Sequence, residues 1–205
     1  PVRLTAIANI TKAGPLPQGL FTLHEGAISV FNQQLNEIRK KDLVSKPKMQ
    51  ATSTGGWLGF TDKYWLSALI PDQNQNIVAD INYNSEGSQF LTLTLKYDTA
   101  TIAPQTSNTN TYKLFAGAKE VQILDKYRTE LNIPRFDQAV DFGWYYYLTK
   151  PFFYALNFCS SLTGNVGVAI IIFTVFIRLL LYPIANKSFK EMSNLKKIQP
   201  NVSTT

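Results

Sequence analysis

The sequence predicts a mainly β protein, in which an antiparallel β-sandwich is followed by an aromatic interfacial helix and one transmembrane helix. Three observations favour this fold class. Short runs of β-branched and aromatic residues succeed one another before residue 119, separated by turn residues. Aromatic residues then crowd residues 136–158, and a long apolar run follows at Val166–Lys187. Strands that follow strands, with a helix only late in the chain, favour antiparallel pairing over a parallel βαβ sheet.

The first strands are predicted from apolar runs and the turn residues between them. Residues 20–31, "LFTLHEGAISVF", hold two apolar runs around Glu25-Gly26, which predicts a strand, a tight turn and a second strand. Residues 63–70 and 77–83 are predicted strands, separated by "PDQNQN", whose composition is typical of a turn.

The clearest strand signal is "FLTLTLKY", residues 90–97. Apolar residues alternate with polar ones along it, which places the two sets on opposite faces of a sheet. The apolar set is Leu91, Leu93, Leu95 and Tyr97, and the polar set is Thr92, Thr94 and Lys96. Residues 99–111, rich in Thr, Asn and Ser, are predicted to form a long polar loop.

A short strand and a helix are expected next. "YKLFAGA", residues 112–118, resembles the earlier strands, and the helix is predicted near residues 119–131. Val121, Leu124 and Leu131 recur at helical spacing, so one side of this helix should pack and the other should carry charge.

The aromatic residues after Pro134 predict an amphipathic helix at a membrane surface, over residues 136–164. Tryptophan and tyrosine settle where headgroups meet acyl chains, and this segment directly precedes the apolar run. The alternative is an aromatic helix in a soluble core.

Residues 165–185 are predicted to span a bilayer, because about twenty helical residues cover roughly 30 Å. Lysines are sparse before the span and crowd the residues after it: Lys187, Lys190, Lys196 and Lys197. Positive residues favour the cytoplasmic side, so the C-terminal end should be cytoplasmic and the β-rich part should lie across the membrane.

The span contains an arginine. Thr174 and Tyr182 stand four residues before and after Arg178, so the three share one side of the helix, and Asn186 continues it. We interpret this polar stripe as the lining of a hydrated cavity or helix bundle. The alternative is that Arg178 snorkels to the headgroups. Pro183 should end or kink the helix.

Composition excludes several classes of protein. The net charge of +6 comes from 20 basic and 14 acidic residues that form no basic stripe, which argues against nucleic-acid binding. The single cysteine, Cys159, excludes an internal disulfide and a multi-cysteine metal site. The chain starts without methionine and ends within a polar helical pattern, so we expect a piece of a longer polypeptide.

Five segments in order resemble a known family. They are "HEGAISVF" (24–31), "GGWLGFTDKYWLSALIP" (55–71), "YKLFAGAKEV" (112–121), "DFGWYYYLTKPFF" (141–153) and the long segment 164–200 around Arg178. Together they resemble the YidC/Oxa/Alb family of membrane insertases, particularly its Gram-negative, alphaproteobacterial members. The resemblance covers nearly the whole chain.

The resemblance implies a function and a set of partners. Such a protein inserts and helps fold inner-membrane proteins, alone or with the SecYEG translocon, through a positively charged, hydrated groove. It implies that Arg178 lines the groove together with Thr174 and Tyr182, and that SecDF and nascent membrane proteins are partners. We expect no cofactor and no metal. The start of the cytoplasmic hairpin could meet a ribosome.

The same resemblance implies a division of the chain. Residues 1–135 would form a twisted, mutarotase-like periplasmic β-sandwich, truncated at its N-terminus, and residues 136–164 the interfacial helix. The span would occupy residues 165–185, and residues 186–205 would begin a cytoplasmic helical hairpin.

Two other functional classes compete with this interpretation. An enzyme is disfavoured, because His24 is the only histidine and the acidic residues have no spacing that identifies an acid–base pair: Asp62, Asp72, Asp80 and Glu86. A membrane-anchored periplasmic binding domain without insertase activity remains the alternative, although a simple anchor has no use for Arg178.

Overall fold

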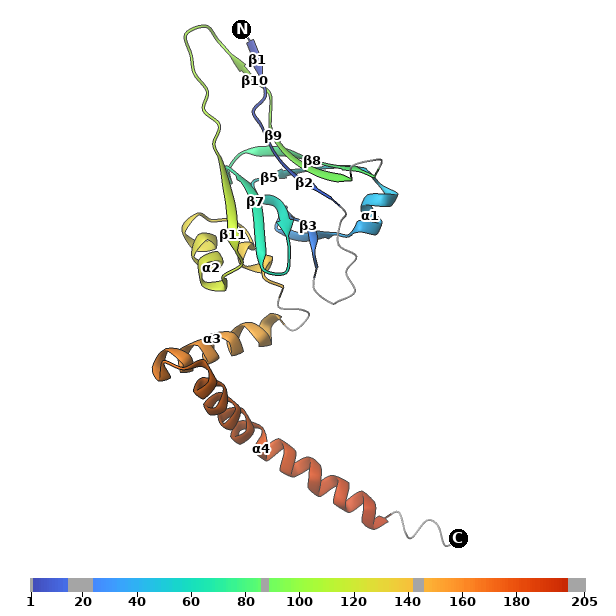
Figure 1. Cartoon of the computed structure of the whole chain (residues 1–205), viewed down its shortest axis with the longest axis vertical. Coiled ribbons are helices and arrows are strands. Elements are labelled where there is room, and N and C mark those ends of the chain that lie inside the picture. Colours follow the sequence, from blue (N-terminus) through green and yellow to red (C-terminus); the bar gives the residue numbers. More distant parts are fainter. Residues whose placement is uncertain (1, 15–23, 86–88, 142–145, 199–205) are drawn as a thin grey trace. The chain divides into compact units, whose positions relative to one another are not determined.

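The computed structural model describes residues 2–14, 24–85, 89–141 and 146–198. It divides into two compact units, Pro1–Gly143 and Trp144–Thr205 (Figure 1). The first unit is rich in β-structure, and the second consists of two helices, α3 (Tyr146–Thr163) and α4 (Val166–Ile198).

In the first unit the described strands are β1 (Val2–Leu4), β2 (Ile7–Ala13), β3 (Gly26–Phe31), β4 (Gln34–Ile38), β5 (Lys48–Thr54), β6 (Trp57–Thr61), β7 (Trp65–Pro71), β8 (Asn76–Asn84), β9 (Phe90–Tyr97), β10 (Ala100–Ile102) and β11 (Tyr112–Ala118). The described helices are α1 (Lys40–Ser45), α2 (Val121–Glu130) and the 3-10 helix η1 (Phe136–Ala139).

The strands form two main sheets with antiparallel pairing. The five-stranded sheet has the order β11-β7-β6-β3-β4, and the four-stranded sheet has the order β2-β9-β8-β5. A separate ribbon pairs β1 with β10. Antiparallel neighbours need only short connections, as the β6–β7 and β8–β9 hairpins illustrate. The predicted antiparallel β-sandwich is therefore confirmed.

The two main sheets enclose the larger core. Strand β9 supplies Leu91, Leu93 and Leu95, all fully buried, as the alternation in its sequence predicts. The five-stranded sheet contributes Leu58 and Leu69 from the other side. Burial of these side chains supplies the main driving force for closing the sandwich.

The outer face of the five-stranded sheet carries a second core. Successive residues of a strand point to opposite faces, so Trp57 lies in this core while its neighbour Leu58 lies between the sheets. Leu124 of α2 and Phe136 of η1 cover Trp57, and the Trp57 and Phe136 rings meet edge to face at 5.3 Å. Because β3 is covered on both faces, its sequence is almost uniformly apolar.

Two expectations for the first unit need correction. The chain between residues 99 and 111 is not all loop, because Ala100–Ile102 forms β10 by pairing with the distant β1. Gly26 is the first residue of β3 and pairs with Thr61, so it is not part of a turn. Its φ of +147° suits glycine. The strand expected before it, in the run that begins at Leu20, lies outside the described residues except for His24, which is not in a strand.

The proposed boundary after residue 135 also shifts. The first unit extends to Gly143, because Phe136 and Ala139 are buried in the outer core and do not belong to an interfacial helix. The helix α3 begins at Tyr146. Aromatic residues suit a protein core and a membrane surface equally well, which is why the sequence alone misplaced Phe136.

In the second unit, α3 and α4 form a helical hairpin. Gly164 ends α3 with a φ of +65°, and its N–H donates to the Ser160 carbonyl oxygen at 2.9 Å. Asn165 then caps α4, because its Oδ1 accepts hydrogen bonds from the N–H groups of Gly167 (2.8 Å) and Val168 (3.4 Å).

Pro183 does not end α4, which continues without interruption to Ile198. A proline inside a helix removes one hydrogen bond, here the one to the Leu179 carbonyl. Apolar residues before Pro183 and an amphipathic pattern after it both favour a helix. The helix therefore continues although this one hydrogen bond is missing. The segment expected to begin a cytoplasmic hairpin at residue 186 is continuous with the span.

Candidate functional site

The apolar part of α4 is long enough to cross a membrane. Val166–Lys187 comprises 22 residues, which corresponds to about 33 Å of helix. Within the described residues it is the only helix with the length and composition of a span. Its large apolar side chains, including Ile171, Phe176 and Leu179, are exposed in the hairpin, as expected for a surface that meets lipid.

Helix α3 covers one side of α4. Ala169 is fully buried, and Phe173 packs edge to face against Phe152 of α3 with 5.7 Å between ring centroids. Ile177 continues the same side one turn later and is half-buried. The small side chain of Ala169 permits close approach of the two helices, and the aromatic pair fixes the contact further along.

The polar stripe of Thr174, Arg178 and Tyr182 faces away from α3. At about 100° per residue, Arg178 stands nine residues and about 180° around the helix from Ala169. Thr174 and Tyr182 lie within about 40° of Arg178 on either side. All three side chains are exposed in the hairpin.

The three stripe residues differ in their hydrogen bonding. Thr174 Oγ1 donates to the Ile170 carbonyl oxygen at 2.7 Å, so its hydrogen is used within the helix while its oxygen can still accept. In the part of the chain that the structure describes, Arg178 makes no hydrogen bond or ion pair. A guanidinium with five donors and a permanent charge needs water or acceptors within the membrane.

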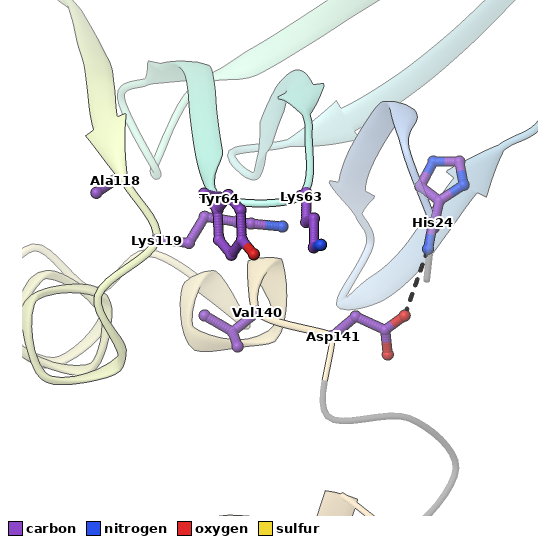
Figure 2. A pocket seen from close by; sticks show the side chains of 7 residues that line it. All are labelled: His24, Lys63, Tyr64, Ala118, Lys119, Val140 and Asp141. Carbon is purple, nitrogen blue, oxygen red and sulfur yellow. Dashed lines mark hydrogen bonds between the residues drawn. The ribbon is translucent and has the colours of Figure 1, made fainter. Parts of the chain in front are cut away.

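The β-rich unit has a pocket of about 330 Å³ at one end (Figure 2). It is lined by His24, Lys63, Tyr64, Ala118, Lys119, Val140 and Asp141. These residues come from the start of β3, the β6–β7 hairpin, the end of β11 and the segment after η1. Sequence reasoning missed this pocket, although "DKYW" between two strands marks an aromatic and basic hairpin tip.

Those residues considered for catalysis that the structure describes make local contacts within the fold. His24 Nε2 lies 2.8 Å from the Ala27 carbonyl oxygen, and its backbone N–H donates to Asp141 Oδ2 at 3.4 Å. Asp72 accepts the N–H of Asn74 within a turn, and Asp80 forms an ion pair with Lys96 across two strands. Asp62 accepts the N–H of Lys63, and Glu86 lies outside the described residues. The described residues contain no cluster of metal-ligating side chains.

A β-sandwich followed by an aromatic helix and an apolar span is typical of a class, that of membrane proteins with a large folded domain outside the bilayer. Comparison with known proteins agrees. Residues 1–155 match the family described as YidC periplasmic domain, and residues 158–204 match the family described as 60Kd inner membrane protein.

Curated relatives agree with both family matches. A protein of Rickettsia massiliae named "Membrane protein insertase YidC" is 41% identical over 182 residues, covering 88% of this chain and 32% of the relative. Proteins of the same name from Sinorhizobium medicae and Granulibacter bethesdensis are 37% and 41% identical, covering 98% and 93% of this chain and 34% of each relative. The chain belongs to the YidC family and spans about a third of the length of these relatives.

Proposed function

We propose that this chain is part of a membrane protein insertase, which inserts and helps fold inner-membrane proteins. The relatives that carry this name support the proposal. The observation that carries it is the orientation of the stripe. Since α3 occupies the opposite side of α4, the stripe of Thr174, Arg178 and Tyr182 is available to line a groove completed by other helices of the full-length protein.

The groove would act by lowering a physical barrier. A hydrophobic segment that enters a bilayer must carry its polar flank through hydrocarbon, which is costly for each unpaired polar group. A hydrated groove part-way across shortens that path. Arg178 would hold water in the groove and attract acidic residues of the translocated flank, with Thr174 and Tyr182 as further polar contacts.

The proposed topology follows from charge. Lys187 and Lys190 follow the span, which favours a cytoplasmic location for the end of α4. The β-rich unit, proposed above as residues 1–135 and extended here to residue 143, would then be periplasmic. Beyond the span, Phe189 and Met192 are exposed on α4 and could contact the membrane surface or a ribosome.

The proposed partners are nascent membrane proteins and the lipid bilayer, with SecYEG and SecDF as translocon components. No chemical reaction is proposed. The single histidine is bonded to backbone, and the carboxylates described above are held in turns and strand pairs.

The test is rescue of insertion in cells depleted of their own insertase. The full-length protein would be supplied with Arg178, Arg178→Ala or Arg178→Lys, and a client with a short acidic tail would be scored by protease protection. Lys187→Ala is the matched control, because it removes a positive charge at the last residue of the apolar segment, about two and a half turns of helix away from the middle of the stripe. We expect Arg178→Ala to reduce insertion at least tenfold and Arg178→Lys and Lys187→Ala to retain most of it.

Equal rescue by Arg178 and Arg178→Ala would reject the role of the stripe. Failure of every form, with normal expression, would favour the alternative in which the β-rich unit is an anchored binding domain without insertase activity.

A further inference from the structure

We propose that the end of the β-rich unit formed by the β6–β7 hairpin and the adjoining pocket binds the surface of a phospholipid bilayer. The proposal rests on the proposed membrane topology. The site is built from Tyr64 and Trp65 at the hairpin tip, with Lys63 and Lys119 beside them.

The hairpin tip exposes two neighbouring aromatic side chains. Tyr64 is 64% exposed and Trp65 is 61% exposed, whereas Trp57 at the other end of the same hairpin is fully buried. Exposure of the apolar part of each ring to water is unfavourable, whereas the polar tip of each ring can form hydrogen bonds. Such rings are enriched where headgroups meet acyl chains.

Two lysines line the pocket together with Tyr64. Lys63 Nζ lies 5.1 Å from the centroid of the Tyr64 ring, and Lys119 Nζ donates to Thr61 Oγ1 at 3.0 Å. Figure 2 shows Lys63, Tyr64 and Lys119 gathered over Val140 and Asp141. Burial lowers the pKa of Lys119, while Asp141, Asp62 and Glu25 oppose that shift.

The charges at this end favour a zwitterionic headgroup. Lys63, Lys119 and Asp141 place both signs of charge in one pocket of about 330 Å³, and Asp62 and Glu25 add negative charge close to Lys119. Lysines can pair with lipid phosphate, and a carboxylate can attract an ammonium group. A strongly anionic surface would gain no net attraction here, because the acidic side chains offset the two lysines.

The sequence connects this end of the unit directly to the membrane helices. Asp141 of the pocket is separated from Tyr146, where α3 begins, by residues 142–145 alone. The five Cα-to-Cα steps from Asp141 to Tyr146 cover at most about 18 Å even when the chain is fully extended. The length of this connection therefore permits the hairpin tip to reach a bilayer that holds α3 and α4.

The test measures how close the tip comes to lipid headgroups. The full chain, with Cys159→Ser, would carry a single fluorophore at Tyr64→Cys and be reconstituted into phosphatidylethanolamine–phosphatidylcholine vesicles that contain headgroup spin labels in both leaflets. The matched control is Leu4→Cys, an exposed position in β1. Strand β1 pairs with β10, and residues 103–111 connect β10 to the start of β11, the end of that strand away from the pocket.

We expect quenching at position 64 to exceed quenching at position 4 at least twofold. Lys63→Glu should halve the quenching at position 64, whereas Lys113→Glu, at the opposite end of β11, should not change it. Equal quenching at positions 64 and 4 would overturn the proposal. Quenching that required anionic lipid and was abolished by salt would overturn the zwitterionic assignment.

This measurement is independent of insertase activity. It needs only α4 embedded in the vesicle, so a negative result would leave the groove proposal intact, and a failed insertion assay would not alter the quenching.

Discussion

The indole Nε1 of Trp57 donates a hydrogen bond to the carbonyl oxygen of Pro134 at 3.0 Å. Trp57 begins β6, and Pro134 lies between α2 and η1, so this bond ties the helical layer to the five-stranded sheet. Phe136 packs against the same indole. The segment that follows α2 in the sequence and precedes α3 is therefore anchored on one buried tryptophan.

Trp57→Phe should lower the free energy of unfolding by about 1–3 kcal/mol, because it leaves the Pro134 carbonyl without its donor and removes part of a buried ring. The measurement is urea unfolding of the full chain in detergent, followed by near-UV circular dichroism. Trp65→Phe, at an exposed site, should change stability by less than about 0.5 kcal/mol. Equal effects of the two substitutions would contradict the anchoring role of Trp57.

Gly59→Ala should destabilise the sandwich by about 2 kcal/mol or more. A Cβ at position 59 would lie 2.9 Å from the Ala68 Cα and would also meet the Ser67 carbonyl oxygen, so β6 and β7 would have to separate. Gly117→Ala is the control, since its Cβ would make only an ordinary contact, 3.5 Å from the Phe115 ring. The measurement is the urea unfolding midpoint of each variant. An equal midpoint for Gly59→Ala and Gly117→Ala would contradict the prediction and show that β6 and β7 can move apart at little cost.

Tyr97 and Tyr112 make stability sensitive to alkaline pH. Their rings stack at 4.6 Å, and the Tyr112 hydroxyl donates to the Ala6 carbonyl oxygen at 2.9 Å. Burial disfavours the phenolate and raises the pKa of Tyr112 to about 12, from 10.0 in the unfolded chain. The unfolded chain therefore loses its proton first, so this contribution to stability is complete below pH 10 and is lost as pH rises from 10 to 12.

The corresponding experiment is thermal unfolding between pH 9 and pH 12. The decline in Tm across this range should be smaller for Tyr112→Phe than for the wild-type chain, although Tyr112→Phe starts from a lower Tm because the bond to Ala6 is lost. Tyr64→Phe, at an exposed ring, should keep the full decline. A decline of the same size in all three proteins would refute the contribution of Tyr112.

Much of the fold follows from local pattern. The alternation in β9 predicts both its existence and its buried face, and the helical spacing of Val121 and Leu124 predicts the packed side of α2. Strands β4 and β5 were not predicted, because "QLNEI" and "KMQATST" are polar and half-exposed. Their strand conformation depends on pairing with β3 and β8, which local sequence does not reveal.

The candidate site also has one part that local sequence predicts and another part that it does not. The four-residue spacing of Thr174, Arg178 and Tyr182 predicts a shared side of the helix without any structure. That this side is the one opposite α3 depends on the contact between Phe152 and Phe173, which spacing within α4 could not reveal. The pocket beside Tyr64 was also unpredictable, since it joins segments that are far apart in the sequence.

The most direct test of the groove is the water accessibility of the two sides of α4. In the full-length protein with Cys159→Ser, single cysteines would be placed on the stripe, as Thr174→Cys and Tyr182→Cys, and two residues before each of them on the other side, as Ile172→Cys and Leu180→Cys. Positions two residues apart differ by about 3 Å in depth but point in nearly opposite directions. A membrane-impermeant maleimide would be applied from the cytoplasmic side of inverted membrane vesicles. We predict that the two stripe cysteines react at least tenfold faster than Ile172→Cys and Leu180→Cys, and equal rates at matched depths would contradict a hydrated groove at Arg178.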